Sequence, residues 1–171
     1  LPEDQTAFWA GFPIVERWEH GYMVGYYNDG EGPGMDATVF SPLVDFRFIN
    51  NTPYHLLIEN YYNQENESLT FKFYSTSMGR RVEKTEPVFE NIVPPPEDDV
   101  WEYDAEIPAG TVQQYDYAAE GARVTVQRQV FNADGELIEE RAFVSNYIPW
   151  PNVFRYGDGV EPGDYSLVPE N

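Results

Sequence analysis

The sequence contains no cysteine, and this absence excludes several kinds of chemistry at once. A chain of 171 residues without cysteine has no disulfide bond, no thiolate metal site and no cysteine nucleophile of its own. It also lacks any run of about 18 apolar residues, the length that a membrane-spanning helix needs. Its start, Leu1 to Asp4, has neither the cationic nor the apolar region of a signal peptide. We therefore expect no direct membrane insertion by this chain.

Basic residues are scarce, because ten Lys and Arg stand against thirty Asp and Glu, and the formal net charge is -20 at pH 7. A surface with this much negative charge repels phosphate backbones and anionic lipid headgroups. The composition therefore argues against nucleic-acid binding and against electrostatic docking to membranes. Plain solubility explains the acidity, and so does life in high salt or outside the cell, where screening removes the self-repulsion.

Helical periodicity is almost absent, whereas apolar and polar residues alternate in several segments. Thr6 to Ala10 is the one short helix that we predict, with Gly11 as its C-terminal stop. Polar turns at 63–68 and 132–135 favour two hairpins. The predicted fold class is mainly β, in two small β-rich domains with at most one short N-terminal helix. Strands are predicted around residues 44–48, 55–61, 69–73, 122–131 and 136–147.

A run of three prolines and three acidic residues divides the sequence at 94–99. Three fixed φ angles and three carboxylates favour an extended, solvated segment that neither a helix nor a central strand tolerates. We therefore predict a first domain over residues 1–93, a linker over 94–99, a second all-β domain over 100–160 and a tail over 161–171.

Two histidines, His20 and His55, could act as bases near neutral pH. His55 lies in an apolar strand pattern, so we interpret it as structural. His20 precedes a glycine where the chain changes direction, but a base also needs a nucleophile and an orienting group. No serine lies in a nucleophile-elbow motif. We therefore predict no catalytic residue in this chain.

Acidic turns at Asp29 to Gly32 and at Asp158 to Asp164 offer oxygen ligands for calcium. Their spacing is not that of an EF-hand loop, and turn chemistry explains the same residues. With thirty acidic residues, a carboxylate pair at glycosidase distance would also arise by chance. We predict no metal site and no cofactor.

Aromatic residues are abundant, and several lie beside acidic or polar neighbours. Amphipathic rings of this kind stack on sugar faces while nearby polar groups bind the hydroxyls. For any single ring, packing and cross-strand pairing explain its presence better than glycan binding does. The candidate glycan-binding residues are Tyr115, Asp116, Tyr117, Tyr147 and Trp150, with the rings stacking on sugars and Asp116 binding hydroxyls.

A series of ordered motifs in the first domain carries a family resemblance. The motifs are Ala10-Gly11, Ile14, Glu16-Arg17, His20, Gly34, Asp36-Ala37-Thr38-Val39, Asp45-Phe46-Arg47-Phe48 and Asn50-Asn51-Thr52-Pro53. In order and spacing they resemble the VanW family, named for an accessory protein of vancomycin-resistance clusters. The resemblance implies a bacterial protein that is extracellular or in the cell envelope, from an exported or anchored parent chain, and exposed to peptidoglycan. It implies no settled reaction.

A second set of motifs follows the triple proline. It comprises Ile107-Pro108-Ala109-Gly110, Glu120-Gly121, Val124 to Val130, Asp134-Gly135 and Gly157. These residues resemble the extracellular G-five module, an all-β repeat named for its glycines. That resemblance implies binding to glycans that contain N-acetylglucosamine.

One departure from the VanW pattern bears on catalysis. VanW-like chains usually carry a glycine-rich segment with a Cys-Gln pair just before the stretch that matches Ala7 to Gly11, and Leu1 to Thr6 does not match it. In a longer parent, such a cysteine could form a nucleophile, base and orienter with His20 and Asp36.

Three hypotheses therefore remain open. The first is a non-catalytic envelope accessory protein that binds or positions on peptidoglycan or another cell-wall glycan. The second is a peptidoglycan-modifying enzyme with His20 and Asp36 as surviving members of its site. The third is a structural subunit of a surface assembly, in which exposed aromatics contact a protein partner.

Overall fold

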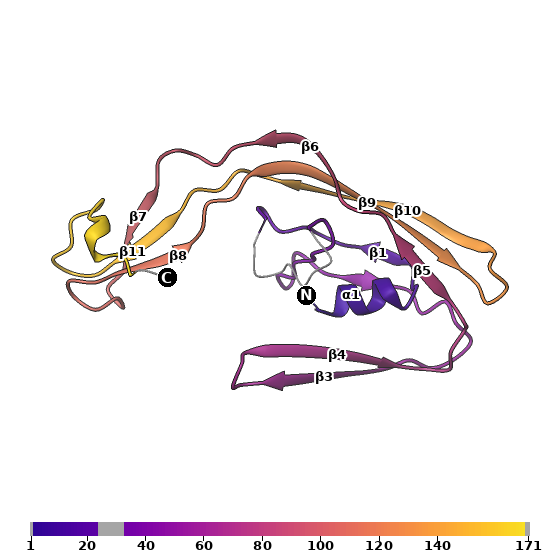
Figure 1. Ribbon diagram of the computed structural model, residues 1–171. Coiled ribbons are helices and arrows are strands. Elements are labelled where there is room, and N and C mark those ends of the chain that lie inside the picture. The colour runs from indigo at the N-terminus through magenta and orange to yellow at the C-terminus, as the bar shows by residue number, and fades with distance from the viewer. Residues whose placement is uncertain (1, 24–32, 170–171) are drawn as a thin grey trace. The chain divides into compact units, whose positions relative to one another are not determined.

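The computed structural model describes residues 2–23 and 33–169 of the chain. In these ranges its regular secondary structure consists almost entirely of β-strands, with one α-helix near the N-terminus (Figure 1). The predicted mainly β fold class is therefore confirmed. No helix in the described ranges is both long enough and apolar enough to cross a membrane.

The chain divides into two compact units, which we describe separately. Unit 1 comprises Leu1–His20, Gly25–Phe89 and Val124–Ser145, and unit 2 comprises Gly21–Val24, Glu90–Arg123 and Asn146–Asn171. This division differs from the boundary predicted at 94–99. The difference arises because two long strands, β9 (Gly121–Phe131) and β10 (Leu137–Tyr147), contribute residues to both units.

The N-terminal helix α1 (Pro2–Trp9) begins four residues before the predicted helix and ends one residue before its predicted end. Gly11 stops it as expected, because its φ of 72° lies in the left-handed region that favours glycine. A Cβ at Gly11 would also lie 3.0 Å from Val130 Cγ1 and 3.2 Å from Arg80 Cδ. Gly11 therefore permits both the turn and the close approach of the following chain to unit 1.

The predicted hairpin in the first part of the chain is confirmed. Strands β3 (Leu57–Asn63) and β4 (Ser68–Tyr74) pair antiparallel, from Asn63 opposite Ser68 to Leu57 opposite Tyr74. Helix α1 packs against β4. Tyr61 on β3 is exposed, and its hydrogen bond to Glu59 raises the pKa of its phenol to about 12, because the carboxylate favours the neutral phenol.

The hairpin predicted at 122–131 and 136–147 is also present as β9 and β10. Strand β9 is paired further with two strands that the sequence analysis did not predict. These partners are β5 (Arg81–Lys84) and β6 (Val88–Val93). A separate two-stranded sheet pairs β1 (Ile14–Glu16) with β2 (Arg47–Phe48).

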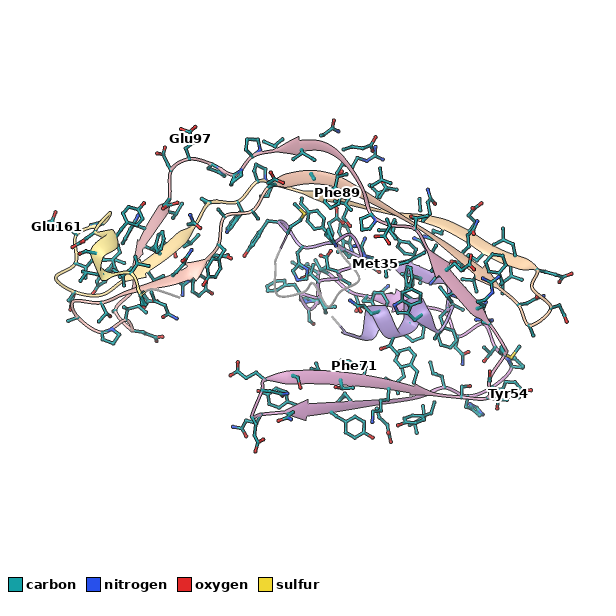
Figure 2. All side chains as sticks on the ribbon, in the orientation of Figure 1. Met35, Tyr54, Phe71, Phe89, Glu97 and Glu161 are labelled. Carbon is teal, nitrogen blue, oxygen red and sulfur yellow. The ribbon has the colours of Figure 1, made fainter. Side chains whose placement is uncertain are left out.

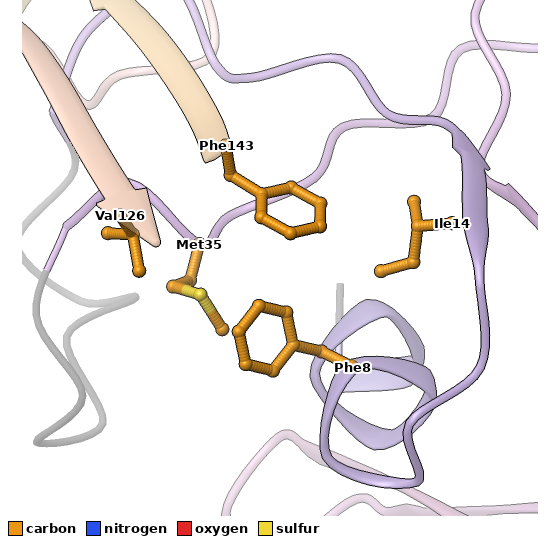
Figure 3. Packing of buried hydrophobic residues seen from close by; sticks show 5 residues of the cluster. All are labelled: Phe8, Ile14, Met35, Val126 and Phe143. Atoms are coloured by element: carbon orange, nitrogen blue, oxygen red, sulfur yellow. The ribbon is translucent and has the colours of Figure 1, made fainter. Parts of the chain in front are cut away.

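The core of unit 1 lies between α1, β1 and the β9–β10 hairpin. It contains Phe8, Ile14, Met35, Val126 and Phe143, which Figure 3 shows around one centre. The rings of Phe8 and Phe143 have centroids 5.4 Å apart. Every second residue of β9 faces inward, as the alternation predicts, and the same face buries the guanidinium of Arg128.

Unit 2 is organised around a three-stranded sheet with the order β7 (Val100–Tyr103), β11 (Val153–Tyr156), β8 (Val112–Asp116). Strand β11 is parallel to β7 and antiparallel to β8. Phe154 on β11 packs with Val112 and Val160 in its core.

Two segments outside this sheet were predicted to be irregular. The triple-proline segment 94–99 has no regular secondary structure, and Glu97 projects from it (Figure 2). The predicted tail instead packs on unit 2 through a short 3-10 helix, η2 (Tyr165–Leu167). The hydroxyl of Tyr165 donates to Asp99 Oδ2 at 2.7 Å, and its ring meets the ring of Trp101 edge-on. Aromatic contacts therefore order a segment that its sequence pattern left unassigned.

Candidate functional site

The two residues of the alternative active site lie together in unit 1. Oδ2 of Asp36 accepts hydrogen bonds from the backbone N–H of His20 at 2.8 Å and from its ring at Nδ1, at 2.7 Å. The two bonds fix the imidazole relative to its own backbone. In the neutral ring, a proton on Nδ1 leaves Nε2 as the basic nitrogen. The pair therefore has the geometry of a base and its orienting carboxylate.

Arg17 joins this pair to the strand β10. Its Nη2 lies 3.6 Å from Asp36 Oδ1 and donates to Ser145 Oγ at 2.8 Å and to the carbonyl of Gly34 at 3.1 Å. Ser145 is fully buried, so the hydroxyl in this network is out of reach of a substrate. The cluster therefore supplies an oriented base. Ser145 cannot serve as the nucleophile, because its hydroxyl is buried. Arg17 belongs to the Glu16-Arg17 motif, whereas no sequence signal distinguished Ser145.

In unit 2, Asp116 lies at the end of β8 and brings two predicted glycan-binding residues together. Its Oδ2 accepts hydrogen bonds from Trp150 Nε1 at 3.1 Å and from the hydroxyl of Tyr22, and its Oδ1 accepts the backbone N–H of Tyr117 at 3.1 Å. The rings of Tyr22 and Trp150 stack, with centroids 4.4 Å apart and planes 4° from parallel. Asp116 therefore acts on Trp150 as a positioning residue.

The exposure of the predicted rings separates them into two groups. Tyr115 and Tyr117 are each 56% exposed, and the guanidinium of Arg155 lies 3.4 Å from the ring centroid of Tyr115. Tyr147 is only 6% exposed, so it packs inside unit 2 and offers no ring face to a sugar. Sequence reasoning missed Tyr22, because a contact across 94 residues leaves no local pattern.

The remaining candidates do not form a site in the described residues. Asp29 to Gly32 lie outside them. Asp158 accepts a hydrogen bond from Tyr103, which raises the pKa of that phenol, and Asp164 caps η2. Across residues 2–23 and 33–169, no group of three or more His, Asp or Glu side chains is arranged to hold a metal ion. His55 is exposed, and its carbonyl accepts the hydroxyl of Ser75 at 2.8 Å.

Comparison with known proteins bears on the first part of the chain. A search among curated proteins gives no match. The model of a family described as "VanW like protein" matches residues 5–74, which is less than half of the chain. The matched segment contains α1, the His20–Asp36 pair and the β3–β4 hairpin. This segment of the protein is therefore similar to the VanW-like family, whose signature the sequence motifs predicted.

Proposed function

We propose that this protein is a non-catalytic accessory protein of the bacterial cell envelope, located outside the cytoplasm, that binds peptidoglycan or a related glycan. The observation that carries the proposal is the aromatic surface of unit 2. It comprises the exposed rings of Tyr115 and Tyr117 and, separately, the ring of Trp150, which Asp116 and Tyr22 hold in place. The VanW-like segment in the same chain supports the envelope location.

Rings in this arrangement suit sugars better than they suit polyanions. Tyrosine and tryptophan present an apolar face to the C–H side of a pyranose and a polar edge to its hydroxyls. Fixing Trp150 in advance lowers the entropy lost on binding. The charge of -20 further disfavours phosphate-rich partners and leaves neutral glycans unaffected.

Replacing Tyr117 with Ala is expected to weaken binding to purified peptidoglycan about tenfold, because the loss of one exposed stacking ring removes roughly 1–2 kcal/mol. Cosedimentation over a range of peptidoglycan concentrations measures the change. Tyr62→Ala is the matched control, since Tyr62 is an exposed tyrosine on β3 of unit 1. Equal recovery of wild type and Tyr117→Ala in the pellet would contradict the role of this surface.

The contact between His20 and Asp36 favours a second candidate, a peptidoglycan-modifying enzyme whose nucleophile lies elsewhere. The primary proposal predicts no soluble fragments when peptidoglycan is incubated with the wild-type protein. Chromatography of the supernatant measures their release. Fragments that appear with the wild type and disappear with Asp36→Asn would favour the enzyme, because the amide no longer stabilises an imidazolium.

A further inference from the structure

Unit 1 contains a cavity of about 250 Å³ that the aromatic surface of unit 2 does not involve. One side is aromatic: Trp9 at the end of α1, Phe12 after the helix and Phe73 on β4 all border it. The rings of Phe12 and Phe73 have centroids 6.3 Å apart, and Trp9 remains 39% exposed. The cavity therefore has a partly exposed aromatic wall.

Hydroxyl groups form another part of the lining. Thr52, Ser75 and Ser77 border the cavity, and each makes a hydrogen bond within unit 1. Thr52 donates to Asn50, Ser75 donates to the carbonyl of His55, and Ser77 accepts from the N–H of Gly79. A hydroxyl can donate once and accept twice. These bonds fix the side chains and leave hydrogen-bonding capacity for a ligand.

Arg80 provides the only charged side chain among the described residues that line the cavity. Its Nη1 donates to the carbonyl of Gly11 at 2.9 Å, and its guanidinium lies 5.9 Å from the centroid of the Phe12 ring. Five guanidinium N–H groups exist, so one such bond leaves donors for a ligand. The backbone contact and the ring hold the group in a defined orientation.

The charge around Arg80 is unusual for this protein. Six of its eight arginines form ion pairs with carboxylates, whereas Arg80 forms none with the described residues. Acidic residues make up 30 of 171 positions, yet no Asp or Glu of the described residues borders the cavity. A cation without a protein carboxylate favours an anion from outside.

We infer that this cavity binds one saccharide unit that carries a carboxylate, with the carboxylate at Arg80, the ring face on Trp9 and the sugar hydroxyls at the Ser and Thr side chains. The volume limits the ligand to a small unit, because it lies below the roughly 300–1,000 Å³ of pockets for drug-sized molecules. Guanidinium binds planar carboxylates in a fork geometry, and the aromatic wall selects a ring with an apolar face. The inference extends the proposed function to a second, independent site with a defined ligand class.

The test compares three small probes: methyl glucuronide, the neutral methyl glucoside and the peptide carboxylate N-acetyl-alanyl-alanine. Titration of the full chain is followed by the NMR signals of the indole N–H groups, with Trp9→Phe used to assign the Trp9 signal. We expect glucuronide to bind at least tenfold more tightly than glucoside and than the peptide. We also expect its affinity to fall with added salt, because a charge pair is screened.

Two variants separate the contribution of the Arg80 charge from that of the Trp9 ring. Arg80→Gln is expected to abolish the preference for glucuronide over glucoside while it leaves glucoside binding within about twofold, and Trp9→Ala to weaken both sugars. Arg81→Gln is the matched control, since Arg81 pairs with Glu83 on β5 and does not line the cavity. Equal affinities for the two sugars, an unchanged preference in Arg80→Gln, or tighter binding of the peptide would overturn the inference. None of these results depends on Tyr117, so the proposed function is tested separately.

Discussion

Replacing Glu139 with Leu should destabilise unit 1 by about 3–5 kcal/mol, because it leaves a buried cation without its counter-ion. The cation is Arg128, whose side chain is 0% exposed, whereas that of Glu139 is 22% exposed. Arg128 donates to the carbonyls of Phe8 and Phe12 and pairs with Glu139, so the carboxylate is its one anionic partner among the described residues. Burial already lowers the pKa of Arg128, which shows the direction of the desolvation cost. Urea unfolding monitored by circular dichroism measures the change.

The double variant Arg128→Met/Glu139→Leu distinguishes a stranded charge from simple loss of packing. It removes the cation together with its partner, and the carbonyls of Phe8 and Phe12 then lose a donor each, which costs about 1–3 kcal/mol per group left unpaired. Two unpaired carbonyls together cost about 2–6 kcal/mol, which is comparable with the cost of the stranded cation, so we expect the double variant and Glu139→Leu to be about equally stable. Glu83→Gln, in the exposed pair with Arg81, is the control and should change stability by less than about 1 kcal/mol. A double variant that is clearly less stable than Glu139→Leu would contradict the electrostatic explanation.

Arg128 also shows what a period-two pattern cannot predict, namely the partners of a buried side chain. The alternation of Ala122, Val124 and Val126 correctly predicted a strand with one buried face, since side chains on one face of a strand share one environment. The same rule places Arg128 on the buried face, where its charge is tolerable only because a helix end and a second strand supply acceptors. Those acceptors lie 11 and 120 residues away in sequence. Local periodicity predicts the face of a residue but not its partners.

The candidate sites show the same difference between local structure, which the sequence pattern predicts, and contacts between distant residues, which it does not. The polar turn at 63–68 predicted the β3–β4 hairpin because a hairpin is a local structure. The contact between His20 and Asp36 was expected through a family resemblance, since nothing in their local sequence brings them together. The stack of Tyr22 on Trp150 spans most of the chain and had no signal at all. Sites assembled from distant segments therefore required the structure.

One glycine of unit 2 gives the second large expected effect. Gly157 follows β11 and is buried against the loop that precedes β8. A Cβ at this position would lie 2.4 Å from the carbonyl oxygen of Pro108 and 2.5 Å from that of Ile107. Both neighbours are backbone atoms, so no side-chain rotation relieves the contact. The need for glycine here comes from a close approach of two chain segments.

Gly157→Ala should therefore destabilise unit 2 by about 3 kcal/mol, at the upper end of the cost of overpacking, because the loop at 107–108 must move as a whole. Thermal unfolding followed through the indole NMR signals of Trp101 and Trp150, both in unit 2, should show a midpoint lowered by more than about 10 °C. Gly21→Ala is the matched control, since Gly21 is in the same unit and a Cβ there has no atom within 4 Å. It should leave the midpoint within about 2 °C, as surface changes cost within ±0.5 kcal/mol. Equal midpoints for the two variants would mean that the loop yields without cost, and the packing explanation for Gly157 would then be wrong.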